Sequence, residues 1–352
     1  MKLFTVTTIF LAVLNVASCA PKINNLSLYQ KQFITKTSHL PSKEQLAGKS
    51  PKIAVFKFEE SDDTAKQSAL GKSVANNIEN ILTNNKLAKL VDRRASKKLK
   101  KEIQLSELNK TGSYKGPQVA DYAISGAISS ASFTKKYSSG SSFFNPKTGT
   151  YTHIPPSFKY KAEIAGNLKI YDLPSMQVHD NIDFHGYTSR SENVQQDGGF
   201  RLGGLSIGGT QAKGTDRDDG LIRKAGEDGI SSIELELKHI LSARGYILEK
   251  RVKGDDTIFK VTLGSLNGIK HGDKVKIIGQ YDTTNPITNE VEIESRVVSQ
   301  AIISEIIQPK ISWIIVKDRK MAQKIRLGDV VKLNYKRSGL SSLLKQSRKY
   351  LN

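Results

Sequence analysis

The single cysteine of this chain, Cys19, stands directly behind a short apolar segment at the N-terminus. Lys2 precedes an apolar run over residues 3–13, and small residues follow before Cys19. This order is typical of an exported precursor, and about eleven apolar-rich residues are too few to span a membrane. No second cysteine exists with which a disulfide could form within the chain. The fold must therefore be stabilised by hydrophobic cores.

Residues 16–19 read Val16, Ala17, Ser18 and Cys19, which resembles the lipobox of bacterial lipoproteins. The resemblance implies that residues 1–18 are a signal peptide and that Cys19 becomes an N-terminus carrying acyl chains such as palmitate. An ordinary signal peptide with an accidental cysteine is the alternative. Ala20 stands where lipoproteins kept in the inner membrane usually carry Asp. By resemblance to that sorting rule, we expect a lipid-anchored protein on the outer membrane, facing the periplasm.

The charge balance is strongly basic, with a formal net charge of +20. In an envelope location, lipid A phosphates, anionic phospholipids, cell-wall polymer and acidic proteins are better candidate partners than nucleic acid. Residues 244–352 carry 21 Lys and Arg against 11 Asp and Glu, which is half of the excess charge. A basic face is therefore predicted in the last third of the chain.

The periodicity of apolar residues predicts an α/β domain over residues 52–244. Residues 19–51 are polar and are predicted to form a lipidated tether, with any order supplied by docking on neighbours. Buried strands are predicted over 53–58, 87–92, 121–128, 162–171 and 177–187. A spacing of four predicts a helix through Leu70, Val74, Ile78 and Leu82, and a second helix carries Ile230, Ile233, Leu237, Ile240 and Leu241. A basic amphipathic helix is predicted after Arg93.

Four motifs in this domain carry a family resemblance. In order along the chain they are Lys52-Ile53-Ala54-Val55-Phe56, Gly71-Lys72-Ser73-Val74-Ala75, Leu90-Val91-Asp92-Arg93 and Asp121-Tyr122-Ala123-Ile124-Ser125-Gly126. Their order and spacing resemble the curli-secretion channel (CsgG-like) family of outer-membrane lipoproteins. The resemblance implies a sheet with packed helices, related to the anticodon-binding-like N-terminal domain of TolB. It also implies a homo-oligomeric ring in which two hairpins per subunit jointly close a pore through the outer membrane.

The segments that match those hairpins, residues 133–159 and 188–224, depart from the family pattern. A transmembrane strand needs about ten residues in which apolar and polar side chains alternate. The first segment contains the polar run 138–142 and Pro155-Pro156, and the second is interrupted by Gly203-Gly204 and Gly208-Gly209. A ring without a pore therefore stays open as the alternative.

Residues 245–335 are predicted to form a small β-barrel. Strands are expected over 246–252, 257–263, 293–307 and 311–317, with a turn at 254–256. The pattern Gly-Asp-x-Val-Lys occurs twice, beginning at Gly272 and at Gly328, which predicts two similar corners of the barrel. With the turn at 285–290, the segment resembles the SH3-like C-terminal barrel of the flagellar H-ring protein FlgT, a type of barrel that usually binds partners. Residues 336–352 are predicted to be a basic amphipathic tail, or a solvated terminus.

Catalytic signals are weak, and we expect no enzyme, cofactor or metal. Gly71-Lys72-Ser73 and Gly48-Lys49-Ser50 resemble the end of a phosphate-binding loop, but Lys66 and Lys43 stand where that loop needs glycine. His179, Asp183 and His185 would share one face of a strand, where a metal or acid-base site and plain surface residues are the two interpretations.

Two functions follow. One is an outer-membrane lipoprotein of a curli-type secretion or assembly apparatus, with secreted or envelope proteins as partners. It would form a ring, and in one version of this hypothesis the ring is also a pore for export. The alternative is a periplasmic scaffold lipoprotein without a pore, of the flagellar-ring or cell-wall-synthesis regulator type. An envelope enzyme is a third class, and it would require a pocket that the sequence does not indicate.

Overall fold

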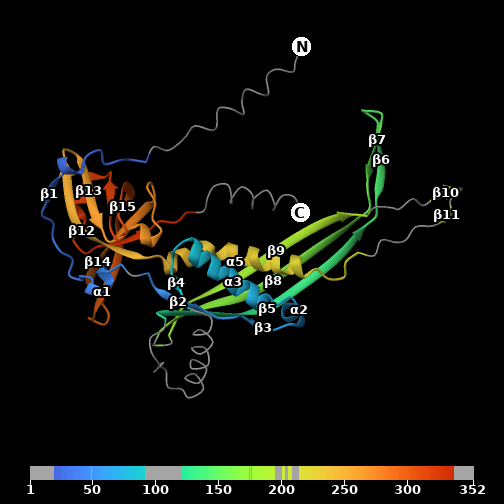
Figure 1. The fold of residues 1–352 in the computed structure, drawn as a ribbon, viewed down its shortest axis with the longest axis horizontal. Helices are drawn as coiled ribbons and strands as arrows, with labels where there is room; N and C mark the ends of the chain where they lie inside the picture. Colours follow the sequence, from blue (N-terminus) through green and yellow to red (C-terminus); the bar gives the residue numbers. More distant parts are fainter. Residues whose placement is uncertain are drawn as a thin grey trace, which may run out of the picture. The chain divides into compact units, whose positions relative to one another are not determined.

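The computed structural model describes residues 20–48, 50–91, 120–173, 175, 177–194, 200–202, 205–207 and 214–336. The chain forms two compact units, one over residues 51–238 and one that combines the N-terminal segment with the chain from residue 239 onward (Figure 1). The fold class is mixed α/β with mostly strands, and it includes a closed six-stranded barrel. The lipobox residues up to Cys19, the helix predicted after Arg93 and the tail after residue 336 lie outside the described residues.

The unit of residues 51–238 is a sheet with helices packed on it. Its elements are β2 (Lys52–Val55), β3 (Glu59–Glu60), α2 (Asp63–Gln67), α3 (Leu70–Asn84), β4 (Lys89–Leu90), β5 (Tyr122–Ser138), β6 (Ser141–Asn145), β7 (Thr150–Ile154), β8 (Ser157–Asp172), β9 (Val178–Asn193), β10 (Phe200–Leu202), β11 (Leu205–Ile207) and α5 (Asp219–Leu241). The main sheet has the order β4-β2-β5-β8-β9, with β3 beside β5. β2 is parallel to β4 and β5, whereas β5, β8 and β9 are antiparallel neighbours.

Both helices that the periodicity predicted are present, because each places one apolar stripe on the sheet. The four apolar residues of the predicted stripe on α3, from Leu70 to Leu82, are all buried. α5 crosses the sheet at Gly186 of β9, where an added Cβ would lie 1.8 Å from the carbonyl oxygen of Ala225. Only glycine permits this approach of strand and helix backbones.

The predicted strand boundaries were less accurate than the helices. The strand predicted over 53–58 ends at Val55, and the one predicted over 87–92 is the two-residue β4. Phe58 leaves the strand and packs edge-on against Phe184, with the ring centroids 6.2 Å apart. In the opposite sense, β5, β8 and β9 run well into the predicted excursions 133–159 and 188–224, and α5 begins at Asp219 inside the second one.

The second unit contains the closed barrel that was predicted over 245–335. Its elements are β1 (Gln30–Gln32), α1 (Lys43–Leu46), β12 (Arg244–Lys253), β13 (Asp256–Val261), β14 (Lys274–Thr284), β15 (Val291–Ile307), β16 (Ser312–Val316), α6 (Arg319–Lys324) and β17 (Val330–Leu333), with short 3-10 turns at Leu26–Leu28 and Ser265–Asn267. The order β12-β13-β16-β15-β14-β17 closes through the pairing of β17 with β12. Its interior is filled by apolar side chains that include Phe259, Val275, Ile303 and Val331.

The two Gly-Asp motifs form the same corner, as their repetition predicted. Gly272 and Gly328 have φ of +88° and +87°, a left-handed conformation that favours glycine. A carboxylate oxygen of Asp273 accepts from the backbone N–H of Lys270 at 2.7 Å, and Asp329 accepts from that of Arg326 at 2.8 Å. The repeat therefore encodes one turn used twice.

The polar segment that was predicted as a tether lies folded on the barrel over residues 20–48. β1 pairs with the outer side of β12, and Ile23, Tyr29 and Ile34 are buried. A carboxylate oxygen of Glu305 accepts from the backbone N–H of Ile23 at 2.8 Å. The neighbouring barrel thus supplies the order of this segment.

Candidate assembly surface

The strands β5, β8 and β9 extend beyond the helices of their unit as a three-stranded sheet (Figure 1). β5 pairs with β2 and β3 only up to Ile128, and the N–H of Ala131 donates to the carboxylate of Asp62 at 2.5 Å. Beyond that point the strands in register are residues 132–138 of β5, 157–163 of β8 and 187–193 of β9. We call these three seven-residue segments the outer sheet.

Both edges of the outer sheet are open among the strands that the structure describes. Residues 132–138 pair only with β8, and β9 pairs only with β8 along its whole length. The N–H of Val194 donates to the carbonyl oxygen of Pro156 at 2.8 Å. Because hydrogen-bonded pairs alternate in an antiparallel ladder, the N–H groups of Tyr187, Ser189 and Ser191 point away from β8. These donors are available to a further strand.

One face of the outer sheet carries a row of aromatic rings and is called the aromatic face. The Tyr160 ring stacks at centroid distances of 5.9 Å on Phe133 and 6.1 Å on Phe158, and Phe158 contacts Tyr137 at 5.1 Å. The Arg190 guanidinium lies 5.4 Å from the centre of the Tyr160 ring. Such contacts each stabilise by about 0.5–1.5 kcal/mol beyond the burial of area.

Residues 214–219, which lead into α5, lie over this aromatic face and are called the strap. The N–H of Thr215 donates to the Tyr160 hydroxyl at 3.0 Å. Lys135 Nζ lies 2.5 Å from a carboxylate oxygen of Asp216, and Arg190 Nη2 lies 3.2 Å from one of Asp218. The strap therefore covers Tyr160, which is buried, and is held there by specific polar contacts.

The end of the strap is held on α2 by Arg217. Its Nη2 donates to the hydroxyl of Ser68 at 2.9 Å, and its Nε donates to the carboxylate of Asp219 at 2.6 Å. The hydrogen bonds from Arg217 and Ser68 hold the pKa of the Asp219 carboxyl below its usual value. Asp219 is thus ionised at the N-terminus of α5, where the helix dipole favours negative charge.

The opposite face of the outer sheet concentrates cations and is called the lysine face. Lys136 and Lys159 are direct cross-strand neighbours, and Lys161 follows two residues along β8 with Nζ 5.9 Å from the centre of the Tyr187 ring. Like charges placed directly opposite each other destabilise a sheet. A face built in this way is suited to an anionic surface or polymer that neutralises it.

The hairpin of β6 and β7 follows the outer sheet in the chain, between β5 and β8, and exposes large apolar side chains. Phe143, Phe144, Tyr151 and Ile154 are each about half exposed or more, and the rings of Phe144 and Tyr151 lie 5.1 Å apart. Aromatic side chains next to lysine, here Lys147, suit a membrane–water interface.

The histidine cluster predicted on β9 is not assembled as one site. His179 lies at an irregularity of the β8–β9 ladder and pairs with Asp172 at 3.2 Å and with Asp180 at 3.5 Å. Asp183 and His185 are exposed further along the strand. Within the described part of the chain, no group of three or more His, Cys, Asp or Glu residues could hold a metal ion.

The Gly71-Lys72-Ser73 motif lies in the first turn of α3, and that turn has no room for a phosphate. The Gly71 N–H donates to a carboxylate oxygen of Glu60 at 2.9 Å, and a Cβ at Gly71 would lie 2.2 Å from the carbonyl oxygen of Phe58. Gly48 of the other motif accepts from the Asn267 amide at 3.3 Å. Lys49 lies outside the described residues.

No protein-family model and no curated protein matches this chain. Among the described helices, none is long and apolar enough to cross a membrane.

The sequence analysis did not predict the aromatic face or the lysine face. A signal was present, because Phe158, Tyr160 and Ala162 alternate with Lys159 and Lys161, as in a strand with two different faces.

Proposed function

We propose that this chain is a lipid-anchored outer-membrane protein that assembles into a homo-oligomeric ring in a curli-type secretion or assembly apparatus. It faces the periplasm, performs no catalysis and engages secreted or envelope proteins. The lipobox residues Val16 to Cys19 and the ordered motifs between Lys52 and Gly126 support this proposal. We also propose a finer fold classification, in which the sheet domain is TolB-like and the barrel is SH3-like.

The outer sheet with its two open edges is the observation that carries the proposal. The free edge of β5 and the free edge of β9 lie on opposite sides of the same three strands and offer seven residues each. If β9 of one copy pairs with β5 of the next, the contact is head-to-tail, and repetition closes a ring when the rotation allows it. Such a ring leaves no edge exposed.

The charges and the hairpin tip suggest how the ring meets the membrane. The outer sheet carries five cations and two carboxylates, and three of the cations are on the lysine face. Each Lys or Arg close to an anionic leaflet contributes about 1 kcal/mol of attraction. The lysine face and the aromatic side chains of the hairpin tip therefore support contact with lipid headgroups, in addition to the acyl anchor expected at Cys19.

A ring without a pore is the second candidate, and the polarity of the outer sheet favours it. Seven residues per strand fall short of the 9–11 or so that a membrane strand needs, and neither face is continuously apolar. In this version the same ring is a periplasmic scaffold that binds an envelope machine through its barrel.

A single proline tests the ring contact. Ser189→Pro removes an N–H that points to the open edge, whereas Ser189→Ala keeps it. In lipidated full-length protein purified in mild detergent, we expect electron microscopy to show rings for the parent and for Ser189→Ala, and small species for Ser189→Pro with an unchanged circular dichroism spectrum. Intact rings from Ser189→Pro would contradict assembly through this edge.

Conductance measured in a planar bilayer distinguishes the pore hypothesis from the scaffold hypothesis. The parent protein is compared with a variant in which residues 139–156 are replaced by a two-residue turn, which leaves both edges of the outer sheet in place. Steady conductance of the parent that is lost in the variant supports export through the ring. A silent bilayer from protein that forms rings in electron micrographs supports the scaffold.

A further inference from the structure

The strands β14 and β15 form a hairpin that projects beyond the barrel. β17 pairs with β14 only from Val275 to Ile278, and β16 pairs with β15 only from Ile302 onward. Among the described strands, residues 279–284 and 291–296 therefore pair only with each other, and Val297 pairs only with Ile278 of β14. We call residues 279–297 the hairpin arm.

The β14 side of the hairpin arm is braced by the rest of the unit. The Arg326 guanidinium lies 4.3 Å from the centre of the Tyr281 ring and donates to the carbonyl oxygen of Gln280 at 2.8 Å. His39 Nε2 lies 2.7 Å from a carboxylate oxygen of Asp282. These contacts fix the arm from one side only.

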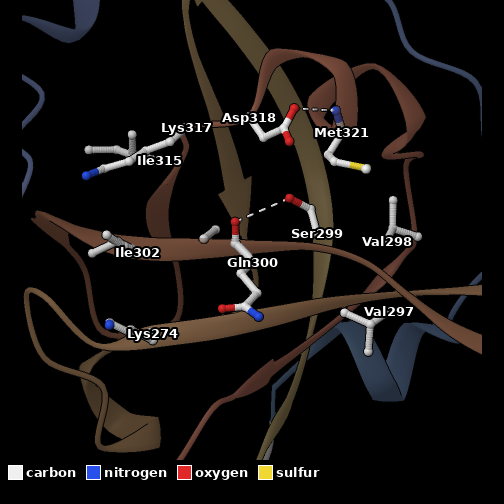
Figure 2. A pocket seen from close by; sticks show the side chains of 11 residues that line it. Lys274, Val297, Val298, Ser299, Gln300, Ile302, Ile315, Lys317, Asp318 and Met321 are labelled. Carbon is white, nitrogen blue, oxygen red and sulfur yellow. Dashed lines mark hydrogen bonds between the residues drawn. The ribbon is translucent and has the colours of Figure 1, made fainter.

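The β15 side borders an open groove of about 500 Å³. Figure 2 shows Gln300 in its middle, Met321 of α6 above and Val297 at one end. The N–H of Asn285 donates to the carbonyl oxygen of Glu290 at 2.9 Å, which sets the phase of the ladder. Since hydrogen-bonded pairs alternate, the backbone groups of odd-numbered residues 291–297 point away from β14. These N–H and C=O groups could therefore form ladder hydrogen bonds with an added strand.

The side chains along this edge are unusually apolar for a solvent-exposed strand. Val291 is 69% exposed, and Ile293 and Val297 are each 57% exposed. They alternate with Glu292, Glu294 and Arg296, and Ser295 stands between Ile293 and Val297. An exposed apolar edge is a template for pairing with another chain.

We propose that β15 pairs antiparallel with β15 of a second copy, with the twofold axis at Ser295. In this register Ile293 faces Val297 of the other copy, and Glu294 faces Arg296 of the other copy, each contact occurring twice. The outward backbone groups of Ile293, Ser295 and Val297 bond to their counterparts. Val291 of the second copy comes beside Ser299, at the groove.

The sequence of the edge explains why the occupant is a second copy and not an unrelated peptide. Only a strand with Glu two places before Arg, flanked by apolar residues, satisfies both charges and both apolar positions, and β15 itself is such a strand. Glu294 and Arg296 already bond within one chain, Nε to Oε1 at 2.6 Å, so pairing joins two ion pairs into a four-charge network. Cross-strand pairs of these types each stabilise by about 0.2–1 kcal/mol.

A disulfide placed on the twofold axis tests the register. In a full-length Cys19→Ala background, Ser295→Cys supplies the only thiol, and a residue on the axis faces itself at a distance that a disulfide can bridge. Thr284→Cys, on the exposed end of β14, is the matched control. Under mild oxidation we expect most of the Ser295→Cys protein, and little of the control, to run as a dimer on a non-reducing denaturing gel. Monomer from both, or equal dimer from both, would overturn the proposal.

A charge exchange tests the network independently. Glu294→Arg and Arg296→Glu each place like charges opposite each other in the dimer, and we expect each to weaken dimerisation in sedimentation equilibrium at least tenfold. The double variant exchanges the charges and should return to within about threefold of the parent. Loss in the double variant as large as in the singles would contradict the pairing.

This contact is separable from the ring contact, because each lies in a different unit of the chain. Ser189→Pro changes the edge of β9 only. The Ser295→Cys crosslink is therefore expected to persist in a Ser189→Pro background. Its loss there would show that the β15 contact depends on the ring and would overturn it as an independent interface.

Discussion

The outer sheet and the hairpin arm are both β-structures that extend past their own cores, but their open edges differ in chemistry. The outer sheet presents two polar edges and a face with three lysines. The hairpin arm presents one edge, with three exposed apolar side chains and a Glu-x-Arg pattern. Two unlike edges on one body suit head-to-tail assembly, whereas one self-complementary edge suits a twofold pair.

The difference also concerns how register is specified. In the proposed contact between two copies of β15, a slip by one residue would place the apolar side chains of the two strands on opposite faces and separate Glu294 from Arg296 of the other copy. In the outer sheet, serines at positions 189 and 191 tolerate several registers, so the strap and the helix contact at Gly186 must fix the geometry. The comparison can be tested by substituting the residues that hold the outer sheet and the hairpin arm to the rest of their units.

The largest effect is expected at the base of the outer sheet. Gly186→Val places side-chain atoms where the carbonyl of Ala225 already lies at 1.8 Å from an ideal Cβ. Helix and strand must separate, and we expect a loss of about 3–5 kcal/mol in the free energy of unfolding. Ser189→Val, three residues along and exposed, should change it by less than about 0.5 kcal/mol. Urea unfolding followed by circular dichroism measures both, and equal midpoints would refute the close approach.

The corresponding anchor of the hairpin arm is Asp329, which is 1% exposed. It accepts from the Arg326 backbone at 2.8 Å and from the guanidinium at 3.2 Å, and that guanidinium stacks on Tyr281 of the arm. Asp329→Ala should lower the free energy of unfolding by about 2–3 kcal/mol. Asp273→Ala, in the equivalent and less buried corner, should cost about 1 kcal/mol. A larger cost for Asp273 would contradict this order.

Titration of Asp329 separates its charge from its hydrogen bonds. Burial raises the pKa of this carboxyl above its usual 3.8, although the contacts with Arg326 oppose the shift. The folded state therefore binds the proton more tightly than the unfolded chain. Stability from this group is fully present below about pH 3.8 and is lost as pH rises through the folded pKa. Relative to Asp329→Asn, the parent should gain stability in urea unfolding as pH falls from 7 to 4. A difference in the free energy of unfolding between the parent and Asp329→Asn that stays constant with pH would contradict the raised pKa.

Much of the fold could be predicted from local patterns. Leu70, Val74, Ile78 and Leu82 gave α3 because a four-residue spacing on one face is a local property. The paired Gly-Asp corners were predictable for the same reason, since each turn is closed within four residues. Strand ends were not predictable. Whether β5 stops at Ile128 or continues to Ser138 depends on partners nineteen or more positions away in the sequence.

The candidate surfaces depend on that same missing information. Lys136 and Lys159 are 23 positions apart in sequence, and only the ladder of β5 with β8 makes them neighbours. The strap over Tyr160 comes from residues 214–219, which lie within the segment 188–224 that the sequence analysis treated as an excursion. For β15, the alternation of Val291 and Ile293 with acidic residues could be recognised in the sequence. That none of the described strands pairs with the outer side of residues 291–297 could not.

The strap is expected to contribute a smaller effect than either anchor. Tyr160→Phe keeps the stack with Phe133 and Phe158 but removes the hydroxyl that accepts from the Thr215 N–H. Because Tyr160 is buried, we expect a loss of about 1 kcal/mol in the free energy of unfolding. Tyr137→Phe, on the exposed part of the same row, should be neutral. Hydrogen exchange at Thr215 that is unchanged in Tyr160→Phe would argue against the bond.

The smallest stability effect is expected on the lysine face, and its sign is opposite. Lys159→Glu replaces a like-charge pair with Lys136 by an attractive one, which should raise the free energy of unfolding by a few tenths of a kcal/mol. The same change should weaken binding of a full-length Cys19→Ala protein to vesicles rich in anionic phospholipid by about tenfold at low salt. Lys310→Glu alters the net charge equally but lies in the barrel unit, and it should leave vesicle binding nearly unchanged. If both substitutions weakened binding alike, net charge and not the lysine face would govern contact with the membrane. The outer sheet would then differ from the hairpin arm in its edges alone.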